Sequence, residues 1–177
     1  GKGTRMKSEK NKVLHKVAGK EMINHVINSA SNISSDIVCI VGHQADQVKS
    51  VVKNDKVDFR LQSKQLGTAH AVKQAKEEIK NHTGDVLILY ADIPLIQEET
   101  LKKMNEYHLE KSASLTILTA VLKNPTGYGR IIRDKQNEIT NIVEEDDANN
   151  KQKKIDEINS GIMCVDSKLL YDALDII

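Results

Sequence analysis

Short apolar runs alternate with segments of helical periodicity through the first two thirds of the chain. The runs at 37–41 and 86–89 are continuously apolar, which predicts strands that are buried on both faces. At 22–30 and 69–79 apolar residues recur every three or four positions, and 98–111 is also expected to be helical. Strands that alternate with helices predict an α/β fold, with a Rossmann-like, mostly parallel sheet flanked by helices.

The pattern changes after Pro125. Shorter strands with alternating residues are expected there, at 130–133, 139–143 and 159–165. A last helix is predicted from about Lys168. No hexapeptide periodicity of the kind that builds a parallel β-helix is present. We therefore expect the chain to consist of two parts, 1–122 and 123–177.

Composition and charge exclude several classes of partner. The 177 residues carry 26 basic and 25 acidic side chains, a net charge of +1, and 3% are aromatic. Neither an electrostatic field nor a stacking surface for nucleic acid is therefore expected. The sequence has no apolar run of the roughly 20 residues that a membrane span needs and no signal segment. We expect no membrane partner and a cytoplasmic location.

The cysteines and histidines do not predict a metal or nucleophile site. Cys39 and Cys164 are far apart in apolar stretches, which is typical of buried free thiols. The six histidines lack metal-ligand spacing, and no serine or cysteine lies in a nucleophile elbow. Zinc chemistry and hydrolysis are therefore not expected.

Candidates for phosphate and metal binding lie in two places. The loop 1–5, GKGTR, combines glycines with basic side chains, which suits either phosphate binding or a flexible terminus. Lys12 precedes two apolar residues and could hold a point charge against the protein body. Asp92 follows an apolar strand and precedes Pro94, so it is either an Mg²⁺ ligand at a strand end or a local cap.

Further candidates could recognise a base or bind hydroxyl groups. Gln62 is expected at a strand end, Gly67 in a tight turn and Thr68 at the start of a helix. This pattern fits base recognition and ordinary helix capping equally well. Two glycines surround Tyr128 in TGYGR. This pattern fits either a backbone segment that packs against a ligand or a plain turn. Glu144 and Asn159 could bind hydroxyl groups or lie on the surface.

Taken together and in order, seven segments resemble the sugar-nucleotide pyrophosphorylases. The resemblance is greatest to the uridylyltransferase half of the bifunctional bacterial enzyme that makes UDP-N-acetylglucosamine. The segments are GKGTRM (1–6), KVLHKVAGK (12–20), LQSKQLGTAHA (61–71), LYADIPLI (89–96), PTGYGRI (125–131), IVEEDDA (142–148) and EINSGI (157–162). They span the whole chain, which is more specific than any single motif.

The resemblance implies a nucleotide-diphospho-sugar transferase fold, with a nucleotide-binding part at 1–122 and a sugar-binding part at 123–177. It also implies an Mg²⁺-dependent reaction. UTP and N-acetylglucosamine 1-phosphate would give UDP-N-acetylglucosamine, a precursor for peptidoglycan and lipopolysaccharide, and pyrophosphate. Carried over by motif, the nucleotide-binding residues are Gly1, Gly3, Lys12, Gln62, Gly67 and Thr68. The catalytic residues are Arg5, Lys12 and Asp92, with Asp92 as the metal ligand. The sugar-binding residues are Tyr90, Ala91, Asp92, Gly129, Glu144 and Asn159.

The chain departs from the family pattern at several points. Position 91 is alanine where the family usually has glycine, and Asn11 replaces the more usual proline or aromatic residue. Relative to the family, we expect both ends of the domain to be missing, together with the β-helical acetyltransferase domain. A homotrimer is expected only if that domain belongs to the native protein. Two alternatives stay open: a sister enzyme that uses another sugar or dTTP, and a non-catalytic module that binds nucleotide sugars.

Overall fold

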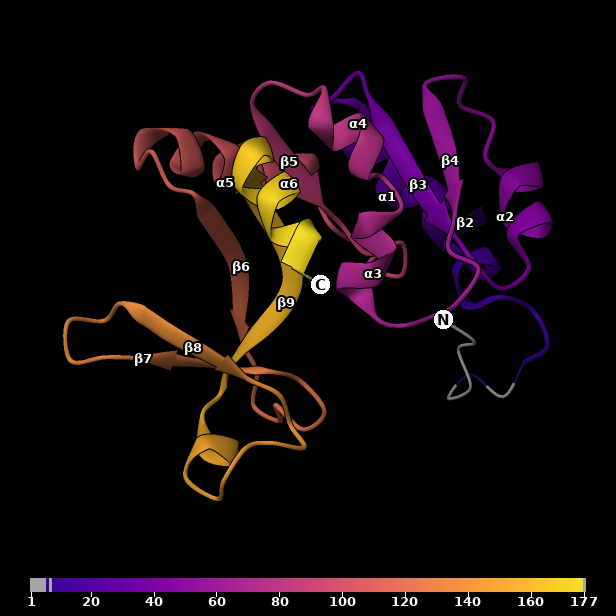
Figure 1. Cartoon of the computed structure of the whole chain (residues 1–177). Helices are drawn as coiled ribbons and strands as arrows, with labels where there is room; N and C mark the ends of the chain where they lie inside the picture. Colours follow the sequence, from indigo (N-terminus) through magenta and orange to yellow (C-terminus); the bar gives the residue numbers. More distant parts are fainter. Residues whose placement is uncertain (1–5, 7, 177) are drawn as a thin grey trace.

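The computed structural model describes residue 6 and residues 8–176 as an α/β protein (Figure 1). Its strands are β1 (Lys16–Val17), β2 (Lys20–Glu21), β3 (Ile37–Val41), β4 (Val57–Leu61), β5 (Asp85–Ile88), β6 (Leu115–Val121), β7 (Arg130–Arg133), β8 (Ile139–Val143) and β9 (Glu157–Asp166). Its helices are η2 (Lys12–Leu14), α1 (Met22–Ser31), α2 (Ala45–Val51), α3 (Thr68–Lys73), α4 (Lys76–Lys80), α5 (Glu98–Glu110), η3 (Gln152–Lys154) and α6 (Ser167–Ile176). The predicted α/β fold with flanking helices is confirmed. None of the helices described is long and apolar enough to cross a membrane.

β3 and β4 form a parallel pair, in register from Ile37 opposite Val57 to Val41 opposite Leu61. The β-branched side chains of β3 favour this extended conformation and pack well on a pleated surface. One buried cluster joins the pair to η2, α1 and α2: Leu14, Ile23, Ile27, Val41, Val48 and Val57. Because the strands are parallel, the residues that follow them emerge at the same edge of the sheet.

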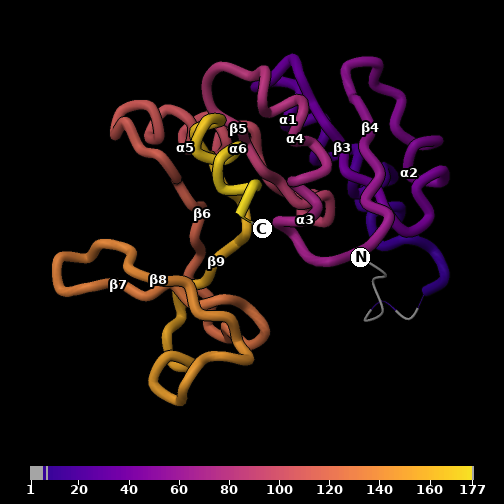
Figure 2. Tube along the Cα trace, viewed as in Figure 1, coloured from indigo at the N-terminus to yellow at the C-terminus, as the bar shows by residue number. Residues whose placement is uncertain are grey.

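β9 lies between β5 and β6 and runs antiparallel to both. β5 and β6 therefore run parallel to each other, as the apolar runs predict, but they are not direct neighbours. Among the pairings described, β3 and β4 are parallel, whereas neighbouring strands of the five-stranded sheet are antiparallel. This differs from the mostly parallel pairing expected from the sequence, because β9 returns from the second part of the chain into the sheet (Figure 2).

The helix expected at 69–79 is divided into α3 and α4. The backbone leaves helical geometry at Ala75, with φ −100° and ψ 17°, and the two short helices both pack against α6. Ala75 and Ile79 are buried with Leu170 and Leu174 of α6. The periodicity correctly marked the buried face but not the break.

β7 and β8 form a hairpin that projects away from the β3–β4 pair, with η3 in the loop beside it (Figures 1 and 2). The hairpin is joined to the rest of the sheet where Arg130 lies opposite Ile158 of β9. The strands predicted in the second part of the chain are thus present. The division of the chain at residue 122 stays a prediction.

Candidate functional site

A lysine and an aspartate meet at the carboxyl end of β5. Lys12 Nζ lies 2.6 Å from Asp92 Oδ2, and both side chains are partly exposed. η2 positions the lysine, and Asn11 caps it by accepting the Val13 backbone N–H at 3.2 Å. Asn11 also donates to the His43 carbonyl at 2.8 Å, so the residue that departs from the family pattern ties this loop to the end of β3.

The turn after β4 is closed by one buried amide. Gln62 is 9% exposed, and its Nε2 donates to the Gly67 carbonyl at 3.1 Å and lies 3.0 Å from His70 Nδ1. Gly67 has φ +105° and directly precedes α3, a conformation that favours glycine. A Cβ at Gly42 would lie 2.9 Å from Gln65 Nε2. Gly42, which the sequence motifs did not single out, therefore leaves room for this turn.

Tyr90 connects the turn to β9. Its hydroxyl lies 3.1 Å from Thr68 Oγ1, so Thr68 contacts the tyrosine, and α3 has no side-chain N-cap. On the other side the Tyr90 ring packs against Gly161, where a Cβ would lie 2.1 Å from Cε2. Gly161 belongs to the EINSGI segment, but its role could not be predicted without this contact.

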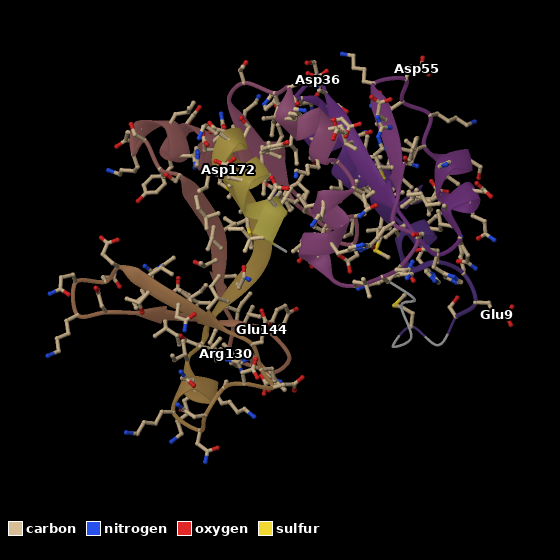
Figure 3. The ribbon with its side chains drawn as sticks, viewed as in Figure 1. Glu9, Asp36, Asp55, Arg130, Glu144 and Asp172 are labelled. Carbon is tan, nitrogen blue, oxygen red and sulfur yellow. The ribbon has the colours of Figure 1, made fainter. Side chains whose placement is uncertain are left out.

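The three residues predicted to bind sugar, apart from segment 90–92, lie together. The Asn159 backbone N–H donates to the Gly129 carbonyl at 2.8 Å. A Cβ at Gly129 would lie 3.0 Å from Glu144 Oε1, so these two residues are in close contact. Asn159 Oδ1 accepts the Gly161 N–H at 2.9 Å. Figure 3 shows Glu144 beside Arg130, where the β7–β8 hairpin meets β9.

These contacts form one continuous line, which we call the site line: Thr68, Tyr90, Gly161, Asn159, Gly129 and Glu144. Segment 90–92 ends at Asp92, which forms the ion pair with Lys12. Within this segment, Ala91 packs against the buried cluster of β3 and β4. The structure therefore brings together candidates that the sequence places far apart. Gly1, Gly3 and Arg5 lie outside the described residues.

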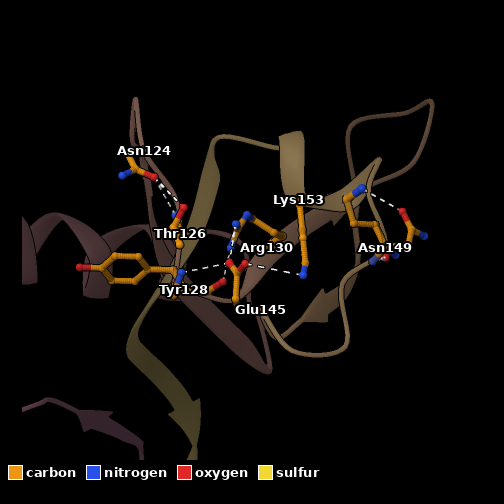
Figure 4. Close-up of polar contacts among 9 residues, drawn as sticks. Asn124, Thr126, Tyr128, Arg130, Glu145, Asn149 and Lys153 are labelled. Atoms are coloured by element: carbon orange, nitrogen blue, oxygen red, sulfur yellow. Dashed lines mark hydrogen bonds and ion pairs between the residues drawn. The ribbon is translucent and has the colours of Figure 1, made fainter.

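A buried arginine holds the TGYGR loop in place (Figure 4). Arg130 is 1% exposed, and its Nη2 donates to Glu145 Oε2 at 2.7 Å. The Gly127 N–H donates to the same carboxylate oxygen at 3.0 Å, and Lys153 Nζ lies 3.9 Å from Oε1. Sequence analysis singled out Glu144 but missed Glu145, because adjacent acidic residues give no signal of which one faces the loop.

These contacts predict that stability depends on pH through Glu145. The Gly127 N–H and then the Arg130 guanidinium lower the pKa of the Glu145 carboxyl. A lowered folded-state pKa stabilises the fold above the ordinary glutamate pKa of about 4.3, and the effect is lost as the pH falls through the folded-state value. Glu145→Gln is expected to lower the urea midpoint at neutral pH and to reduce its loss on acidification.

Glu144→Gln is the matched control, because its side chain is exposed. It should leave the pH profile of the urea midpoint near that of the wild type. If Glu145→Gln and wild type lose stability in parallel as the pH falls, the ion pair does not contribute as described.

The oxygen ligand at the end of β5 fits magnesium. Asp92 offers a partly exposed carboxylate beside a strand end, and Mg²⁺ is usually held by one or two carboxylates together with substrate phosphates and water. In the structure described, the cation beside this carboxylate is the ammonium group of Lys12.

The fold and the line of candidate residues together define the class of protein, an α/β nucleotidyltransferase fold. The chain belongs to the MobA-like NTP transferase family, whose model matches residues 1–148. It is 52% identical over 178 residues to the bifunctional protein GlmU of Clostridioides difficile, and the match covers 100% of this chain and 38% of that protein. It is 47% identical to the bifunctional protein GlmU of Bacillus subtilis, with 99% and 38% covered.

A solved structure of UDP-glucose pyrophosphorylase complexed with UDP-glucose is similar in fold. Its TM-score is 0.76 at 15% identity, and the match covers 99% of this chain and 76% of that one. The identity to the two GlmU proteins along the whole chain confirms the resemblance to the bifunctional bacterial enzyme. The chain spans 38% of the length of the curated relatives described.

Proposed function

We propose that the chain transfers the uridylyl group of UTP to N-acetylglucosamine 1-phosphate, giving UDP-N-acetylglucosamine and pyrophosphate. The observation that carries the proposal is the site line, which runs from the Thr68 turn to Glu144 and passes the Lys12–Asp92 pair. A nucleotide at one end and a sugar at the other would place the reacting phosphates beside the pair. The 52% sequence identity to GlmU along the whole chain supports this choice of substrates.

Uracil is assigned to the Gln62 turn. Because Gln62 Nε2 is engaged by the Gly67 carbonyl and His70, its Oε1 is the group that would accept uracil N3–H. Gly67 would let the base approach the backbone, since it carries no Cβ. Thr68 would contact the base edge from the start of α3.

The phosphates are assigned to Lys12 and Asp92, with Gly1, Gly3 and Arg5 around the triphosphate. Asp92 would hold Mg²⁺, which when bound offsets the charge of the phosphate oxygens. Lys12 would exchange its partner Asp92 for a phosphate oxygen.

The sugar is assigned to the hairpin end of the site line. Asn159 uses Oδ1 on the Gly161 N–H, so its Nδ2 would donate to a sugar hydroxyl or to the acetamido carbonyl. The exposed Glu144 carboxylate would accept from hydroxyls. Gly129 keeps this carboxylate close, because a side chain there would displace it. Tyr90 and Ala91 would lie between sugar and nucleotide.

The reaction needs no protein nucleophile. A phosphate oxygen of the sugar phosphate would form the new bond to the α-phosphorus of UTP, and the bond from that phosphorus to the bridging oxygen would break as pyrophosphate leaves. The chain would contribute alignment and positive charge. The product would supply peptidoglycan and lipopolysaccharide precursors, and a cytoplasmic location is part of the proposal.

The test is release of pyrophosphate by the purified chain, and by a longer version that matches the full length of its GlmU relatives. Each is mixed with UTP and N-acetylglucosamine 1-phosphate, with and without Mg²⁺. We expect release only when both substrates and Mg²⁺ are present. Faster release with dTTP or glucose 1-phosphate would indicate a sister enzyme. Binding of the nucleotide sugar without release by either version would indicate a binding module.

A further inference from the structure

Three potential metal ligands converge at the end of β5 that is remote from Asp92. Asp85 begins β5, His108 lies in the last turn of α5, and Cys164 lies in β9. One ligand atom from each lies within 4.8 Å of the others. Cys164 is paired with Leu87 of β5 and with Thr116 of β6. Asp85 shares a face with Leu87, because side chains alternate along a strand, and α5 covers that face.

The histidine is oriented as a ligand would be. His108 is 2% exposed, its Nδ1 lies 2.8 Å from Thr116 Oγ1, and its Nε2 lies 3.2 Å from Asp85 Oδ1. When Nδ1–H donates to the threonine hydroxyl, the lone pair of Nε2 faces the carboxylate of Asp85. A hydrogen bond from the other ring nitrogen is the usual support of a metal-bound histidine.

The spacing suits a small tetrahedral ion. Two ligands that each lie about 2 Å from Zn²⁺ at the tetrahedral angle are about 3.3 Å apart, close to the 3.2 Å between His108 Nε2 and Asp85 Oδ1. Cys164 Sγ lies 3.9 Å from Asn105 Oδ1.

A pocket gives access to this cluster from solvent. It has a volume of about 300 Å³ and is lined by Asp85, His108, Asp166 and the turn after α5. Asp85 is 18% exposed at its side chain, whereas His108 is 2% exposed and Cys164 1%. An ion would therefore enter beside the carboxylate, and water from the pocket could supply the fourth ligand.

We propose that Asp85, His108 and Cys164 form a binding site for a thiophilic divalent cation of the Zn²⁺ class. Imidazole and thiolate ligands suit such an ion, whereas Mg²⁺ requires oxygen ligands. The site differs from the Asp92 position in ligand chemistry and lies at the opposite end of β5. A bound ion would link β5, α5 and β9. The sequence spacing of cysteines and histidines did not predict it, because the ligands come from three separate elements.

The test is a titration of the purified chain with Co²⁺, followed by absorption. We expect one equivalent to give a thiolate-to-cobalt charge-transfer band and tetrahedral d–d bands. Zn²⁺ should abolish these bands by competition, and millimolar Mg²⁺ should not. The chain has two cysteines, so Cys164→Ser and Cys164→Ala should remove the charge-transfer band, whereas Cys39→Ser should keep it. Asp85→Asn should weaken Co²⁺ binding by about tenfold or more.

Folding is checked independently by circular dichroism and by the melting temperature of each variant. Zn²⁺ should raise the melting temperature of the wild type and of Cys39→Ser but not that of a folded Cys164 variant. Absence of a charge-transfer band in the folded wild type would overturn the proposal. So would a band that persists in both Cys164 variants, or one that Cys39→Ser removes.

Discussion

Asp92→Asn is expected to lower kcat for pyrophosphate release by about 10²-fold or more. The amide is nearly the same size as the carboxylate but has no charge for Mg²⁺, and it no longer forms an ion pair with Lys12 Nζ, which lies 2.6 Å away. The measurement is the initial rate of pyrophosphate release over a series of Mg²⁺ concentrations. If the assigned role is right, the variant should need more Mg²⁺ than the wild type for half-maximal rate.

Asp58→Asn is the matched control, since Asp58 is an exposed aspartate of β4 and should retain the wild-type rate. Lys12→Met separates the two members of the pair: it should lower kcat without raising the Mg²⁺ requirement. A wild-type rate for Asp92→Asn at ordinary Mg²⁺ would exclude Asp92 as the metal ligand.

Gly161→Ala is expected to destabilise the fold by about 2 kcal/mol or more and to raise KM for both substrates. Gly161 has φ +79°, and a Cβ there would lie 2.1 Å from Tyr90 Cε2 and 2.9 Å from Cζ. The ring must move, which would break the hydrogen bond between Tyr90 and Thr68. Urea unfolding gives the change in stability, and the dependence of rate on UTP and sugar phosphate gives each KM.

Gly19→Ala separates backbone strain from steric overlap. Gly19 has φ +81°, but a Cβ there would meet nothing within 4 Å. It should therefore be less destabilising than Gly161→Ala and should leave both KM values unchanged. A second variant, Gly161→Ala with Tyr90→Leu, should recover part of the lost stability. Equal effects of the two single alanine substitutions would show that contact with Tyr90 is unimportant.

The sequence predicted most elements of the fold but not how they pair. Apolar periodicity located β3 at 37–41 and β5 within one residue of the expected 86–89, because the side chains of both strands pack against buried clusters. It could not predict that β9 enters between β5 and β6, since pairing depends on contacts between residues far apart in the chain. Nor could it predict the break at Ala75, where packing on α6 outweighs helical periodicity.

The candidate site was predicted from ordered motifs, and its supporting residues were not. Glu144, Asn159 and Tyr90 carry recognisable chemistry within their motifs, and the structure brings them into one line. Glu145 and Gly161 act through a buried arginine and a close ring contact. Those roles depend on distances of a few ångströms, which a linear pattern does not contain.

The position of β9 also affects the order in which the protein can fold during synthesis. β5 and β6 leave the ribosome well before β9, so each strand keeps an unpaired edge until Glu157–Asp166 has been made. Exposed strand edges and late long-range pairing slow folding and favour aggregation. A nascent chain that stalls before residue 157 would thus contain most of the apolar core residues but lack the strand that joins them, and it would be a natural client for chaperones.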